Sequence, residues 1–177
     1  MKKILVIMLC AFAVSFSANA QNKFGHISIS EVVNLMTERD SAIVQLSRYQ
    51  AELVEEMEAM QTEYNNKINT YQQKQATWST AVRESKEAEL QEIVQRIQNF
   101  EQSATNDLNN LQNSLMAPIY QKAQDAIDKI AKSRGLTFVF DTTTLLYFDA
   151  SQSTDLLPLV KAELGIPAAK VSPSVIE

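Results

Sequence analysis

Few side chains in this sequence could carry out covalent or metal chemistry. There is one histidine, His26, and one cysteine, Cys10. A metal site needs several ligands and an activated nucleophile needs a base, and neither residue has such a partner in its sequence neighbourhood. Serine, aspartate and glutamate are common, but no glycine-rich loop or nucleophile elbow accompanies them. We therefore expect no enzyme activity, no metal and no cofactor, and we assign His26 to the surface of a strand.

The spacing that does stand out is that of the turn-forming and apolar residues. Between Gly25 and Gly135 lie 109 residues without glycine and with one proline, Pro118. Glycine and proline are the residues that mark turns, so this stretch predicts very long helix. Proline removes a helical hydrogen bond, and we expect Pro118 to bend the helix that contains it.

Two series of apolar residues recur there at spacings of three and four. The first consists of Ile43, Leu46, Leu53, Met57, Met60, Tyr64 and Tyr71, interrupted by Gln50 and Lys67. The second consists of Leu90, Val94, Ile97, Ala104, Leu108, Leu111 and Leu115, interrupted by Glu101. This spacing predicts the seam of a coiled coil.

The two series mirror each other, because partners such as Met57 and Ile97 have numbers that sum to 154. The symmetry predicts one antiparallel hairpin over 31–134 with its tip near 75–80, although a slip of one heptad has the same periodicity. Ser79 or Thr80 is the expected N-cap of the returning helix. Trp78 at the tip could contact a binding partner or cover the turn.

The two ends of the chain, 21–30 and 135–165, are expected to form a small β-rich body. Strands are predicted at 24–29, 137–140 and 145–148, with Ser30 capping the helix that begins at Glu31. Ser153 or Thr154 would cap a last helix through Leu164, followed by a mobile tail over 166–177. Three short strands with apolar residues on both faces need cover on both sides, so the body should oligomerise. The residues expected in that assembly are Ile27, Ile29, Phe138, Val139, Phe140, Leu146 and Phe148.

The N-terminus reads as a cleaved signal peptide over 1–20, with a basic start, an apolar run and a small-residue cleavage site. Without Lys2 and Lys3, 14 basic and 21 acidic residues remain, a net charge of −7. This charge disfavours nucleic acid as a partner. No other segment is apolar enough to span a bilayer, so we expect an exported protein that is not embedded in the membrane.

The mature chain resembles the OmpH/Skp family of periplasmic chaperones over its whole length, most specifically in its C-terminal segment. The resemblance rests on PIYQKAQDAIDKIAK at 118–132, GLTFVFD at 135–141, LLY at 145–147 and DLL at 155–157. It implies an α+β, mostly helical fold, in which a small β body trimerises and long coiled-coil hairpins project from it like the tentacles of a jellyfish. The chain is acidic where the enterobacterial members are strongly basic, so no lipopolysaccharide-binding residues are carried over.

The resemblance also implies a function and partners. Such a homotrimer would hold unfolded outer-membrane β-barrel precursors in the cavity between its tentacles, prevent their aggregation without ATP, and release them towards the outer-membrane insertion machinery. The alternative is a structural periplasmic coiled-coil spacer or an adaptor of an envelope complex. An adaptor normally carries larger folded segments on both sides of its hairpin than are present here.

Overall fold

The computed structural model describes residues 23–171. The predicted signal peptide at 1–20 and the last part of the predicted tail lie outside the described residues. The described chain forms two compact units. The body unit comprises the described residues up to Leu35 and from Tyr120 onward, and the arm unit comprises Met36–Ile119. The predicted fold class, mostly helical with a long hairpin and a small sheet, is confirmed.

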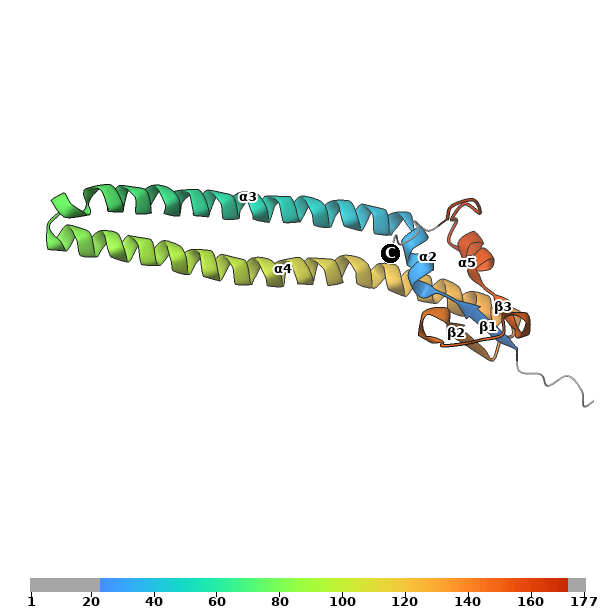
Figure 1. The fold of residues 1–177 in the computed structure, drawn as a ribbon. Coiled ribbons are helices and arrows are strands. Elements are labelled where there is room, and N and C mark those ends of the chain that lie inside the picture. The colour runs from blue at the N-terminus through green and yellow to red at the C-terminus, as the bar shows by residue number, and fades with distance from the viewer. Residues whose placement is uncertain (1–22, 172–177) are drawn as a thin grey trace, which may run out of the picture. The chain divides into compact units, whose positions relative to one another are not determined.

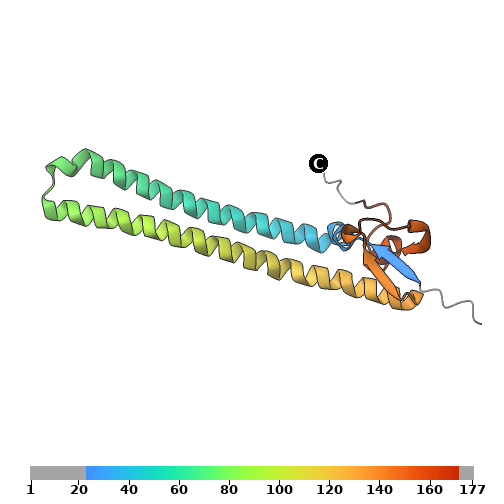
Figure 2. The same cartoon turned by 60° about the horizontal axis from the view of Figure 1, so that its bottom comes forward.

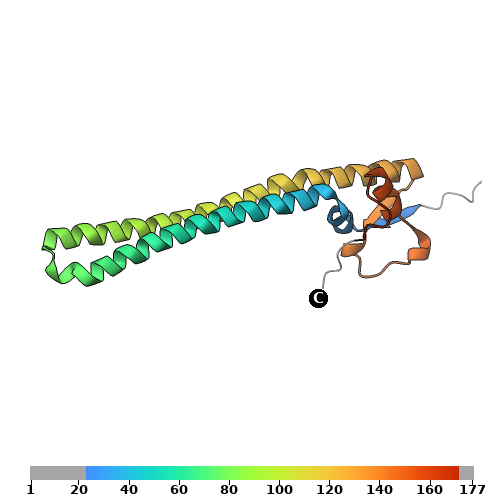
Figure 3. The same cartoon turned by 90° about the horizontal axis from the view of Figure 1, so that it is seen from above.

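The arm unit is an antiparallel pair of long helices, which run side by side in Figures 1 and 3. Helix α3 spans Thr37–Lys74, a short 3₁₀ turn covers Gln75–Thr77, and helix α4 spans Thr80–Arg134 and so contributes to both units. The Ser79 side chain accepts a hydrogen bond from the Val82 amide at 3.4 Å, as expected of an N-cap. In the described part of the chain, no helix combines the length and the apolar character that crossing a membrane requires.

Pro118 lies inside α4 and does not end it. Proline has no backbone N–H, so the carbonyl of Ser114 loses its usual helical partner. The helix continues to Arg134, where Gly135 takes the left-handed conformation with φ of 61°. A bend at Pro118 stays a prediction.

The body unit contains a three-stranded parallel sheet in the order β2-β1-β3 (Figure 2). Its strands are β1 Phe24–Ile27, β2 Phe138–Asp141 and β3 Ser153–Asp155. Its helices besides the end of α4 are α2 Ile29–Leu35 and α5 Leu157–Glu163, and 3₁₀ turns cover Thr142–Thr144 and Ala150–Gln152. The buried apolar residues of this unit are Ile27, Val32, Val33, Leu35, Ala123, Ala126, Ile127, Leu156, Val160 and Ile166.

Gly25 lies against two leucines of this core. A Cβ at that position would lie 2.7 Å from Leu136 Cδ1 and 3.2 Å from Leu156 Cδ1. The first distance is shorter than real Cβ contacts and the second is tight, so a side chain at residue 25 would force Leu136 to shift.

The first helix begins earlier than predicted and is interrupted. The Ser28 hydroxyl, not that of Ser30, accepts the Glu31 amide at 3.1 Å, and α2 therefore starts at Ile29. Met36 then adopts an extended conformation, with φ of −77° and ψ of 136°, which separates α2 from α3.

The predicted strand over 145–148 is wrong, because the third strand is β3 at Ser153–Asp155. Two aspartates explain the difference. Asp141 and Asp149 accept hydrogen bonds from the amides of Thr143 and Ser151, each at 2.9 Å. These contacts close 3₁₀ turns on both sides of 145–148 and favour a loop there.

The C-terminal end also differs from the prediction. Helix α5 starts at Leu157, whose amide donates to the Asp155 carboxylate at 2.9 Å, so neither Ser153 nor Thr154 is its cap. The described start of the tail is held in place, since the Lys161 ammonium donates to the carbonyls of Ala168 and Lys170, each at 2.6 Å.

Candidate functional site

One face of the sheet carries a cluster of exposed and half-buried rings, which we call the aromatic face. It consists of Phe24, His26, Phe138, Phe140 and Phe148. The ring centres of Phe24 lie 6.2 Å from Phe138 and 5.9 Å from Phe140, and His26 lies 4.7 Å from Phe148. Phe138 is nevertheless 54% exposed and Phe140 40% exposed. Aromatic area of this kind is normally buried, so the face is a candidate interaction surface.

The loop after β2 adds two protruding apolar side chains. Leu146 is fully exposed and Tyr147 is 85% exposed. In the single chain β2 and β3 are the edge strands of the sheet. Edge strands present unpaired backbone groups to any further strand. The body unit therefore offers apolar side chains and open edges together.

The residues predicted for assembly divide into two groups. Phe138, Phe140, Leu146 and Phe148 are exposed. Ile27 is buried within the chain, Ile29 is half-buried in α2, and Val139 is half-buried on the helix-covered side. Sequence reasoning missed Phe24. Side chains alternate along a strand, so Phe24 and His26 lie on the same face of the sheet and Gly25 lies on the other face.

His26 behaves as a strand-surface residue. Its Nδ1 lies 2.5 Å from the Ser153 hydroxyl oxygen. Among residues 23–171 no group of three or more His, Cys, Asp or Glu side chains could hold a metal ion.

The seam of the arm unit consists of the buried and half-buried side chains that recur without a break at spacings of three and four along each helix. On α3 they are Ala42, Leu46, Tyr49, Leu53, Met57, Met60, Tyr64, Lys67 and Tyr71. On α4 they are Lys86, Leu90, Ile93, Ile97, Phe100, Ala104, Leu108, Leu111 and Leu115. Glu63, Ile68, Glu89 and Met116 are also half-buried and flank the seam. Taken in opposite order, the two sets pair with numbers that sum to 157, as for Tyr64 with Ile93.

The predicted pairing, in which the numbers of partner residues sum to 154, is therefore wrong by three residues. Ile43 is 38% exposed and Val94 is 39% exposed, whereas Ile93 is only 4% exposed. The polar interruptions Gln50 and Glu101 also lie outside the seam, and Tyr49 and Phe100 take their places. The correct register could have been inferred from Tyr49 and Phe100, because large aromatic side chains favour buried positions.

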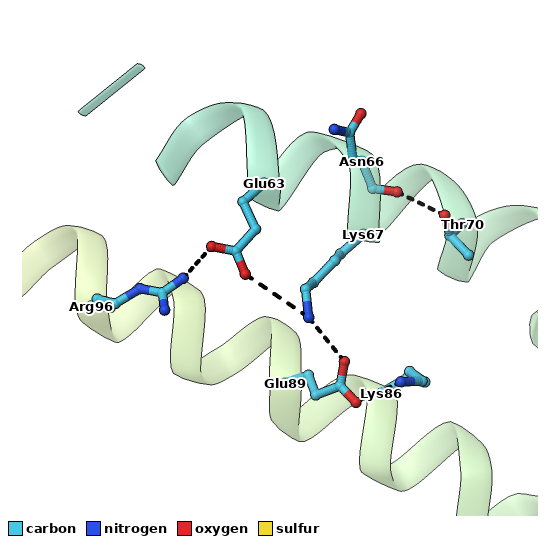
Figure 4. A network of polar contacts seen from close by, with 7 residues as sticks. All are labelled: Glu63, Asn66, Lys67, Thr70, Lys86, Glu89 and Arg96. Atoms are coloured by element: carbon cyan, nitrogen blue, oxygen red, sulfur yellow. Dashed lines mark hydrogen bonds and ion pairs between the residues drawn. The ribbon is translucent and has the colours of Figure 1, made fainter. Parts of the chain in front are cut away.

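Ion pairs across the arm agree with the corrected register (Figure 4). Lys67 Nζ lies 3.2 Å from Glu89 Oε2, and Arg96 pairs with Glu63. The numbers of these partners sum to 156 and 159. Hydrogen bonds from Lys86 and Lys67 hold the pKa of Glu89 below its ordinary value, because they stabilise the carboxylate.

The tip is closed by an aromatic pair. Tyr71 and Trp78 meet edge to face with ring centres 6.0 Å apart, and the Tyr71 hydroxyl donates a hydrogen bond to Glu87. That bond raises the pKa of Tyr71, because ionisation would remove the donated proton. Trp78 is half-buried. It therefore covers the turn while keeping part of its ring in solvent.

Comparison with known proteins gives consistent matches. Residues 23–164 match the family model described as outer membrane protein (OmpH-like). The chain is 26% identical over 169 residues to the chaperone protein Skp of Photorhabdus laumondii subsp. laumondii, covering 91% of this chain and all of that protein. It is 27% identical to the Photorhabdus luminescens chaperone protein Skp, covering 83% of this chain and 90% of that one.

The crystal structure of an OmpH-like protein from Caulobacter crescentus CB15 has a similar fold. The TM-score is 0.69 at 16% identity, and the match covers 83% of this chain and 86% of that one. The helical hairpin and small sheet thus define a Skp-like fold. The family match spans most of the sequence, and the chain belongs to the OmpH-like family of chaperones. Chaperones of this family are not enzymes.

Proposed function

We propose that this protein is a periplasmic, ATP-independent holdase that binds unfolded outer-membrane β-barrel precursors and prevents their aggregation. The observation that carries the proposal is membership of the OmpH-like chaperone family over residues 23–164. The chain's own features support it. The described residues include a long arm of two antiparallel helices. An unfolded barrel strand exposes apolar side chains and unpaired backbone groups, so it needs many weak contacts and no specific pocket.

We further propose that the working form is a homotrimer assembled through the body units. The exposed Phe138, Phe140, Leu146 and Tyr147 support this, because a single chain leaves them in water. The free edges β2 and β3 lie on opposite sides of β1. In a ring of copies, β2 of one subunit would pair with β3 of the next, and closure would leave no open edge. Clients would be held between the hairpins of the three subunits.

An aggregation assay tests the proposed function. A denatured outer-membrane barrel protein is diluted into buffer with or without a stoichiometric amount of the assembled protein, and light scattering is followed over time. We expect scattering to be suppressed without added nucleotide. Unchanged aggregation would overturn the holdase proposal, and a purely structural coiled-coil protein should behave that way.

A further inference from the structure

The seam divides the surface of the arm into two sides of different chemistry. Each residue along an α-helix is rotated by about 100° from the one before it. The residue directly after a seam position in the sequence therefore lies on one side of the seam, and the residue directly before it lies on the other side. The helices α3 and α4 are antiparallel. In an antiparallel pair, the residues directly after the seam positions of both helices fall on the same side of the arm.

The residues that follow a seam position form what we call the glutamine side. They include five apolar residues, six glutamines and only three charged residues. The apolar members are Ile43, Val54, Ile68, Val94 and Met116, and the glutamines are Gln50, Gln61, Gln72, Gln91, Gln98 and Gln112. Ile43, Val54 and Val94 are 38%, 50% and 39% exposed.

The residues that precede a seam position form the charged side. Eight of its eighteen positions are charged, and alanine at position 59 is its single apolar member. The charged residues are Arg48, Glu52, Glu56, Glu63, Glu89, Glu92, Arg96 and Asp107. Several of them already have partners, as in the pairs of Arg96 with Glu63 and of Glu89 with Lys86 and Lys67 (Figure 4). The charged side is thus occupied with its own ion pairs.

The glutamine side does not suit a folded partner. A stable interface between folded proteins buries about 800 Å² on each partner around a contiguous apolar centre. Here Ile43 and Val54 are separated by Gln50, and Val54 and Ile68 by Gln61. A few partly exposed aliphatic side chains between amides cannot supply such a centre.

These features do suit an extended polypeptide. An unfolded chain offers apolar side chains together with unpaired backbone N–H and C=O groups. The glutamine amide both donates and accepts hydrogen bonds, and the aliphatic residues supply weak apolar contacts. Building on the proposed function, we propose that the glutamine side of each arm is the surface that contacts unfolded clients, and that the charged side does not contact them.

A pair of charge-matched variants tests this inference. The variant Val54→Glu/Val94→Glu places two carboxylates on the glutamine side, and Gln45→Glu/Ser103→Glu places two on the charged side. Ser103 lies at the level of Val54 in the corrected register, and all four positions are exposed. We expect the first variant to weaken binding of a fluorescently labelled unfolded barrel protein by about tenfold, since it loses two apolar contacts and gains charge, and the second by less than about twofold.

Site-specific photo-crosslinking provides a readout that does not depend on affinity. A photoreactive residue at position 61 should capture the client, whereas one at position 59, on the charged side, should not. Circular dichroism and light scattering establish that each variant is folded and assembled. If the wild-type protein suppresses aggregation but both variants weaken binding equally, or both sites crosslink equally, this inference is wrong and the holdase function stands. If the wild-type protein does not suppress aggregation, both proposals fail.

Discussion

The arm unit and the body unit bury their apolar side chains in different ways. In the arm, α3 and α4 cover each other's seam within one chain, and Leu90 and Ile93 are buried without help from another copy. In the body, helices cover the side of the sheet that carries Ile27, while Phe138 and Phe140 on the other face remain exposed. The comparison indicates that the arm covers its seam within one chain, whereas the body leaves apolar side chains exposed, as the proposed assembly requires.

The largest expected effect is the loss of the proposed assembly when the aromatic face is made polar. In the variant Phe138→Asp/Phe140→Asp, two carboxylates would have to be buried in the proposed assembly interface, and burial of unpaired charge is very unfavourable. Light scattering with size-exclusion chromatography should show a monomer, while circular dichroism should retain the helical signal of the arm. Leu159→Asp on the half-buried surface of α5 tests whether any new carboxylate in the body has this effect. A trimeric double variant would contradict the proposed role of the aromatic face.

A second experiment concerns the arm. Cysteines replacing Met60 and Ile97 lie at one level in the corrected register and should crosslink within one subunit under mild oxidation. Met57 with Phe100 should behave in the same way, because a disulfide requires Cβ atoms about 4 Å apart. Met57 with Ile97, the pair of the 154 register, should crosslink poorly. Equal yields for all pairs would mean that the register is not fixed.

The smallest effect concerns the exposed ion pairs of the arm. The pKa of Glu89 is lowered from an ordinary value of 4.5 by hydrogen bonds from Lys86 and Lys67. Because the pKa of Glu89 is lower in the folded protein, its hydrogen-bonded carboxylate stabilises the fold above pH 4.5. This stabilisation is lost as the pH falls through the pKa of Glu89 in the folded protein. Glu89→Gln should therefore be slightly less stable than the wild type in urea at pH 7, and this difference should shrink as the pH falls below 4.5. A difference that does not shrink on acidification would show that packing, not charge, is responsible.

The long hairpin could be predicted because its signals are local and repeated. Absence of glycine and spacing by threes and fours specify helix over tens of residues, and Ser79 is a strong N-cap wherever the fold places it. The register was not predicted correctly. Ile43 and Val94 have the spacing of seam residues, and only the packing of Tyr49, Ile93 and Phe100 between the helices excludes them.

The sheet was predicted less well because strands are paired by residues far apart in the chain. Residues 145–148 are apolar enough for a strand, yet Asp141 and Asp149 form turns on both sides, and the polar segment Ser153–Asp155 pairs with β1 instead. The sequence by itself determined the helical hairpin, its tip and the presence of a small apolar sheet, since these follow from periodicity and turn chemistry. The tertiary structure decided the register, the third strand and the aromatic face, because each depends on which distant side chains can be buried together.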